Sequence, residues 1–241
     1  MYQRETTFLK EQMGPYVLSV LKDYEAFIAG GALTSVFSST RINDFDVFFR
    51  TKASLDQALK MAPRDDKTIE TDSALSIISG APDTVGHRVQ LIKVVTGEPD
   101  EVISKFDFTV CQAAMSVPGS ISIFYFDVDF FPHLAQRRLV FNTAAQFPVC
   151  SLYRAAKYIK RGFHFSGIDA IKLGLKIQAL DISNYAELRR QLMGIDTLFL
   201  KDLTDSLAGQ DTKKYELNEF LATLEVWLDQ LNSMTGQESE S

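Results

Sequence analysis

The chain has 241 residues, of which 46% are hydrophobic and 23% charged, with a formal net charge of −6 at pH 7. This balance is ordinary for a globular protein, and the length allows one domain or two small ones. No apolar run approaches the ~20 residues that a membrane-spanning helix needs, and the first residues lack the hydrophobic stretch of a secretory signal. We therefore expect a cytoplasmic protein with no membrane partner.

The predicted elements alternate between helix and strand as far as about residue 142, which indicates a mixed α/β (α+β) fold with a sheet flanked by helices. In chain order they are a helix at 7–27 with a break at Gly14-Pro15, a strand at 44–50, a helix at 55–61, strands at 75–78 and 88–95, a helix at 98–104, and strand-like runs at 106–115 and 120–126 joined by a Pro-Gly turn.

Two aspartates, Asp44 and Asp46, lie within the apolar run of the predicted strand at 44–50. Successive side chains of a strand alternate between its faces, so both carboxylates share one face, with their Cα atoms roughly 7 Å apart. Such a pair can bridge divalent cations that carry phosphates. Two glycines, Gly30 and Gly31, precede the pair and allow the backbone to approach an anionic group closely. The combination suggests nucleotidyl transfer.

After about residue 142 the spacing of the apolar residues changes to that of helices, which predicts a small all-α domain. The expected division is a head at 1–142, a helical neck or companion domain at 143–235 and a disordered tail at 236–241. Arg154, Lys157 and Arg161 recur at helical spacing and form one basic stripe. An apolar face at 217–231 predicts a further packed helix.

The charge of the chain is unevenly distributed. Residues 151–190 carry eight Lys/Arg against three Asp/Glu and are therefore +5, which leaves −11 for the rest. The net negative charge disfavours general nucleic-acid binding, so a DNA duplex is not an expected partner. A local basic segment is typical of binding to one anionic ligand. The two cysteines, Cys111 and Cys150, lack metal-ligand spacing and are expected to be buried thiols.

Three stretches together resemble the polymerase-β-type nucleotidyltransferase superfamily, most of all the head and neck of class II tRNA nucleotidyltransferases and poly(A) polymerases. The first contains Gly30-Gly31 and Asp44-Phe-Asp46. The second, Lys105-Phe-Asp-Phe-Thr-Val-Cys-Gln-Ala-Ala-Met115, resembles a block that contacts the nucleotide ribose. The third, residues 147–163, is similar to the neck helix that closes over the triphosphate.

The resemblance implies roles for individual residues. Asp44 and Asp46 would hold two Mg²⁺ ions, with Mn²⁺ as an alternative. Gly30 and Gly31 would face the phosphates of an NTP, with ATP or CTP expected, and Asp107 would lie near its sugar. The further nucleotide contacts implied by charge and position are Arg41, Arg154 and Lys157.

The sequence also departs from the family's pattern. The Glu-Asp-x-x-Arg template that selects the base is Phe-Pro-Val-Cys-Ser at 147–151, and Gln90 stands where many members carry a third acid. The chain also ends about 80 residues past the neck, too soon for the domains that grip tRNA, so CCA addition is not a safe inference. The leading hypothesis is transfer of NMP to a hydroxyl acceptor, an RNA 3′ end first. Two alternatives stay open: modification of a protein or small molecule by a toxin-like enzyme, and a degenerate fold that binds nucleotide or RNA.

Overall fold

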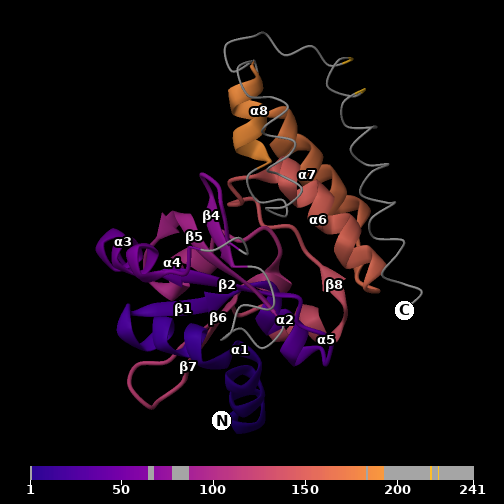
Figure 1. Cartoon of the computed structure of the whole chain (residues 1–241). Helices are drawn as coiled ribbons and strands as arrows, with labels where there is room; N and C mark the ends of the chain where they lie inside the picture. Colours follow the sequence, from indigo (N-terminus) through magenta and orange to yellow (C-terminus); the bar gives the residue numbers. More distant parts are fainter. Residues whose placement is uncertain are drawn as a thin grey trace, which may run out of the picture.

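The computed structural model describes residues 2–64, 68–77, 87–182 and 184–192, together with residues 218 and 222. A seven-stranded mixed sheet with helices against it forms the larger part, and α6, α7 and α8 stand beside it (Figure 1). The strands of this sheet are β1 (Ala26–Ala29), β2 (Asp44–Phe49), β3 (Thr68–Glu70), β4 (Ala74–Ile77), β5 (Arg88–Thr96), β6 (Ala113–Ser116) and β7 (Ile123–Phe126). The helices are α1 (Gln3–Asp23), α2 (Gly31–Phe37), α3 (Lys52–Met61), α4 (Pro99–Ile103), α5 (Phe130–Ala135), α6 (Pro148–Lys160), α7 (Gly167–Gln178) and α8 (Tyr185–Gln191).

The strand order is β3-β4-β5-β2-β1-β6-β7, so β1 and β2 lie at the centre. β2 runs antiparallel to β1 and parallel to β5, the one parallel pair among the described strands of this sheet. A second, two-stranded sheet joins β8 (Arg138–Leu139) to β9 (His164–Phe165), which ties the connection after α5 to the end of α6. This arrangement confirms the expected α/β class.

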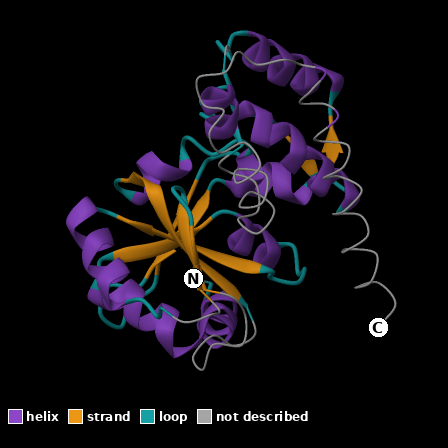
Figure 2. Ribbon diagram, turned by 45° about the horizontal axis from the view of Figure 1, so that its top comes forward, coloured by secondary structure: helices purple, strands orange, loops and turns teal. Residues whose placement is uncertain are grey.

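The two faces of the central strands meet different surroundings (Figure 2). Phe45, Val47 and Phe49 of β2 are fully buried in the main core. Phe48 points to the opposite face, where it joins a smaller cluster with Phe27 and residues of α4. Asp44 and Asp46 alternate with the core residues and therefore share the face of Phe48.

Two of the predicted elements differ from the structure, and α2, β3 and α5 were not predicted at all. The helix expected at 7–27 ends at Asp23, and Ala26–Ala29 is instead strand β1, buried on both faces. The expected break is confirmed, because Gly14 has φ 70° and ψ 174° within α1. The strand-like run at 106–115 contains a 3₁₀ turn (Thr109–Cys111), and pairing with β7 begins only at Ala113.

The helical part that follows the head contains α6, α7 and α8, and α6 contacts both of the others. The apolar helix expected at 217–231 and the tail expected at 236–241 lie outside the described residues, apart from two isolated positions. Within the described ranges, no helix is long and apolar enough to cross a bilayer.

Candidate functional site

The two glycines form the turn from β1 into α2. Gly30 has φ +82° and ψ −133°, a conformation that residues with a Cβ rarely adopt. Its backbone N–H donates to the carbonyl oxygen of Ala113 on β6, at 3.0 Å. A Cβ on Gly30 would lie 3.4 Å from the Phe106 ring, and one on Gly31 would lie 4.0 Å from the hydroxyl of Tyr158. Head and α6 therefore meet at this glycine turn.

The aspartates lie at the start of β2, one strand away from the glycine turn. Ala29 is the register partner of Asp46, so the strand that leads into Gly30 runs directly beside the carboxylates. Both aspartates are half-buried, and the Asp44 side chain is 35% exposed. Two carboxylates on one face are a suitable donor set for Mg²⁺, which is commonly held by one or two carboxylates together with substrate phosphates. The residues present thus fit the expected metal.

Strand β5 contributes the other neighbours of the aspartates. Arg88 is the register partner of Asp44, and Gln90 is the partner of Asp46. The Nη2 atom of Arg88 lies 3.4 Å from the Oδ2 atom of Asp44. The position of a third acid is therefore taken by Gln90, as the sequence indicated. Within the described residues, no group of three or more His, Cys, Asp or Glu side chains is arranged to hold a metal ion.

The predicted sugar contact and the first predicted neck contact bind each other. The Nε atom of Arg154 on α6 lies 3.0 Å from the Oδ2 atom of Asp107, whose side chain is only 10% exposed. The carboxylate of Asp107 raises the pKa of Arg154 further above its usual value. The backbone of Asp107 also accepts a hydrogen bond from Asn142 N–H, at 2.8 Å. Asp107 thus connects the head, the linking segment and α6.

A second contact lies beside this ion pair. The Sγ atom of Cys111 is 3.0 Å from the hydroxyl of Tyr158, and burial raises the pKa of both groups. Burial likewise raises the pKa of Cys150 to about 12. Both cysteines are free and buried, which confirms the expected buried thiols.

The remaining predicted contacts lie at the surface. Lys157 is exposed and stands 5.8 Å above the ring of Tyr153. Arg41 is exposed in the loop before β2, and its charge adds to the effect of burial in lowering the pKa of His87. The start of α6 offers little for base recognition, because Ser151 is buried and donates its hydroxyl hydrogen bond to the Phe147 carbonyl.

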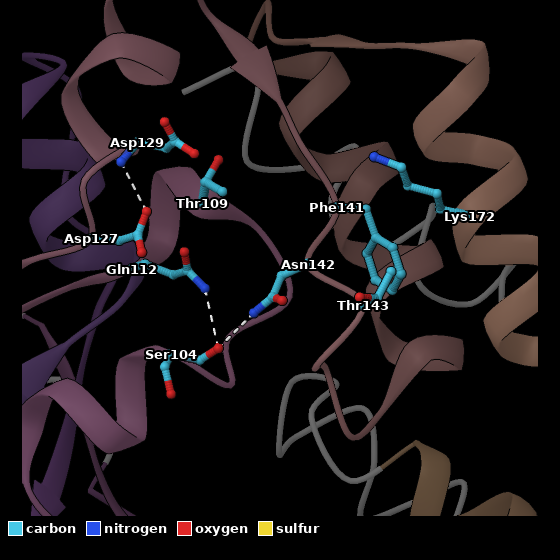
Figure 3. Close-up of a pocket in the computed structure, with 9 residues that line it drawn as sticks. All are labelled: Ser104, Thr109, Gln112, Asp127, Asp129, Phe141, Asn142, Thr143 and Lys172. Atoms are coloured by element: carbon cyan, nitrogen blue, oxygen red, sulfur yellow. Dashed lines mark hydrogen bonds between the residues drawn. The ribbon is translucent and has the colours of Figure 1, made fainter.

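A polar pocket of about 420 Å³ opens between the head and α7 (Figure 3). Its lining includes Thr109, Gln112, Asp127, Asp129, Asn142 and Lys172. Figure 3 shows Gln112 and the two aspartates on the head side and Lys172 on the opposite side. Gln112 is only 4% exposed, and its Nε2 donates to the Ser104 and Phe106 carbonyls, at 3.4 Å each.

The sheet register relates this pocket to the aspartates. One row across the sheet contains Asp46, Ala29, Ala114 and Tyr125. Next to this row, toward the end of the sheet where Asp44 lies, the backbone carbonyl of Gln112 accepts a hydrogen bond from the Asp127 N–H, at 2.9 Å. Neighbouring strands lie about 4.8 Å apart, and Gln112 directly precedes β6, two strands away from β2, so the pocket begins roughly 10 Å across the sheet from the aspartates.

Sequence reasoning missed several residues of this region. Arg88 could have been found by the same alternation that placed Gln90, because it lies two residues earlier on one strand. Asp127-Val-Asp129 is a second Asp-x-Asp motif in the sequence. Tyr158 gave only an aromatic signal on a helix, and no local pattern assigned it to the glycine turn.

The fold is shared with solved nucleotidyltransferases. The Thermotoga maritima CCA-adding enzyme, solved with tRNA, matches 83% of this chain and 53% of its own at 14% identity, with a TM-score of 0.53. A CCA-adding enzyme in an apo form matches 88% of this chain and 54% of its own at 13% identity, with a TM-score of 0.55. These likenesses confirm the nucleotidyltransferase type of fold.

Sequence comparison identifies the family. "Gabija anti-defense 2" from Bacillus phage SPbetaL7 is 30% identical over 197 residues, which are 80% of this chain and 48% of that protein. The chain thus spans about half the length of the curated relative it matches. The family model described as Gabija anti-defense 2 family protein matches residues 3–137, more than half of the chain. The chain belongs to the Gabija anti-defense 2 family.

Proposed function

We propose that this protein is a Mg²⁺-dependent nucleotidyltransferase that moves NMP from an NTP to a hydroxyl acceptor, and that this activity opposes the Gabija defence. The observation that carries the proposal is the placement of Asp44 and Asp46 on one face of β2, beside the Gly30-Gly31 turn, in a nucleotidyltransferase fold. The family name supplies the biological setting.

The proposed reaction needs only a few residues of this chain. The acceptor oxygen attacks the α-phosphorus, the bond to the bridging oxygen breaks, pyrophosphate leaves and the acceptor proton passes to water. Asp44 and Asp46 would hold Mg²⁺, which neutralises the triphosphate and favours the attacking alkoxide. The Gly30-Gly31 turn would lie beside the phosphates. Positioning and charge neutralisation carry most of such a reaction.

The acceptor that we propose first is an RNA 3′ end, and the proposed donor is ATP or CTP. Lys157 supports this, because it remains exposed on α6 while Arg154 turns inward to Asp107. CCA-adding enzymes solved with CTP, with ATP and with tRNA share the fold. The 420 Å³ pocket offers carboxylate oxygens to donor groups of a hydroxyl-bearing acceptor.

The test is incubation of the full chain with each α-³²P-labelled NTP, Mg²⁺ and total RNA. We expect Asp44→Asn and Asp46→Asn each to lower label transfer at least about 100-fold, because each removes a ligand charge at the transferring phosphoryl group. Circular dichroism melting checks that both variants fold. Full activity in both variants would overturn the assignment, and label in added protein instead of RNA would select the protein-modifying alternative.

A non-enzymatic binder is the second candidate, and a specific observation favours it. Arg88 contacts Asp44 and Gln90 replaces an acid beside Asp46, so the site carries fewer negative charges than a three-carboxylate site. A binder of this kind would hold NTP equally well with and without Mg²⁺. Phage plating on hosts that carry Gabija separates the two candidates, because a binder with Asp44→Asn would still protect the phage.

A further inference from the structure

Arg88 lies against one of the two aspartates proposed to bind metal. Strand β5 runs parallel to β2, and this pairing brings Arg88 into register with Asp44 although 44 residues separate them. The guanidinium Nη2 is 3.4 Å from the Asp44 carboxylate. The side chain of Arg88 is 17% exposed and that of Asp44 is 35% exposed, so the contact is largely shielded from solvent on the arginine side.

The charge of Arg88 opposes metal binding at this place. Asp44 and Asp46 supply two negative charges, and the guanidinium cancels one of them. A divalent cation at Asp44 would have to enter beside this positive charge, and like charges repel each other. Gln90 adds no negative charge in its position opposite Asp46. The site therefore has too little negative charge to hold a divalent metal ion tightly without a further anion.

A triphosphate supplies that anion. Its oxygens complete the ligand set of Mg²⁺, which is often held by one or two carboxylates and substrate phosphates together. The planar guanidinium binds phosphate and carboxylate with the same fork of donors, so Arg88 can exchange one for the other. An incoming triphosphate therefore brings charge for the metal and a new partner for Arg88.

We infer that Arg88 holds Asp44 in the nucleotide-free protein and passes to the triphosphate when the nucleotide enters, so that metal binding depends on the nucleotide. This inference rests on the proposed function, because that proposal names Asp44 and Asp46 as metal ligands. The competing interpretation is a purely structural ion pair that joins β2 to β5. Such a pair would affect stability and leave metal affinity unchanged.

The experiment titrates Mn²⁺ into the full chain and follows the free ion by electron paramagnetic resonance, so it does not depend on turnover. It is run alone and with α,β-methylene analogues of ATP and CTP. We expect weak Mn²⁺ binding by the wild type alone and tighter binding with the analogue. Arg88→Gln should raise the nucleotide-free affinity about tenfold and reduce the tightening by nucleotide. Arg88→Met is the second variant and keeps the apolar stem.

The controls separate the possible failures. Arg138→Gln, at an exposed arginine of β8, should leave the Mn²⁺ affinity unchanged. Asp44→Asn should weaken Mn²⁺ binding with and without nucleotide. If the Arg88 variants fold and bind Mn²⁺ with wild-type affinity, while Asp44→Asn binds it more weakly, the proposed role of Arg88 is overturned and the metal site stands. Absence of Mn²⁺ binding in every protein, with nucleotide present, would overturn the metal site and the proposed function together.

Discussion

Arg154 shows how a surface pattern can hide an inward-facing side chain. Its spacing with Lys157 and Arg161 predicts one basic stripe, yet it contacts the nearly buried carboxylate of Asp107 at 3.0 Å. Sequence spacing fixes the helical face of a residue but carries no information on a partner in another part of the chain. The same limit applies to Arg88, whose partner Asp44 is brought close only by the parallel register.

The Asp107–Arg154 pair should contribute measurably to stability. Breaking a fully buried ion pair costs about 3–5 kcal/mol. About a third of the Arg154 side chain is exposed, so we expect Arg154→Met to lower the free energy of unfolding by roughly 2 kcal/mol. Urea denaturation measures this change.

The double variant Arg154→Met/Asp107→Asn isolates the interaction. It should be less destabilised than the sum of the two single variants, because it leaves no unpaired charge behind. Additive effects would show that the two side chains do not interact in solution.

At the scale of elements, alternation identified β2 and β5 because buried core residues alternate with Asp44 and Asp46 at the start of β2 and with half-buried residues at the start of β5. β1 could not be recognised in this way, because all four of its residues are buried and a short apolar run fits a helix equally well. The following glycines resemble a helix end, which extended the predicted helix to residue 27. The paired aspartates and the glycine turn were therefore predictable in kind, whereas their neighbours from β5 and α6 required the three-dimensional fold.

The glycine turn between β1 and α2 should tolerate no side chain. Gly30→Ala forces a Cβ into a backbone with φ +82° and places it against Phe106, and we expect a loss of about 1–3 kcal/mol. Gly174→Ala is the matched control, because it lies in exposed α7 with nothing near its Cβ position. That change should stabilise the protein by about 0.5–1 kcal/mol. Thermal melting compares the two, and equal effects would contradict the strain at Gly30.

At the scale of the whole molecule, the head and α6 are joined by buried polar contacts as well as apolar packing. Cys111 on the head and Cys150 on α6 both lie in this junction, with the charges of Asp107 and Arg154 close to each thiol. The fold class was predictable because strands and helices alternate through the head. The junction was not, because its contacts join segments that are remote in the sequence.

The thiols should report whether the junction is closed. Burial raises both pKa values, that of Cys150 to about 12, so neither group is a thiolate at pH 8. We expect the native protein to react slowly with Ellman's reagent, and both thiols to react rapidly in guanidinium chloride. Rapid reaction of either thiol in the native state would show that head and α6 separate readily.

The central position of β1 has a consequence for biosynthesis. β1 and β2 leave the ribosome early, but β6, which covers the other edge of β1, is made only after β3, β4 and β5. Until then the nascent chain presents an uncovered apolar strand edge, which favours pairing with other chains. Translation that stalls between β5 and β6 should therefore yield aggregation-prone fragments, and a chain that includes β6 is the shortest in which both edges of β1 are covered.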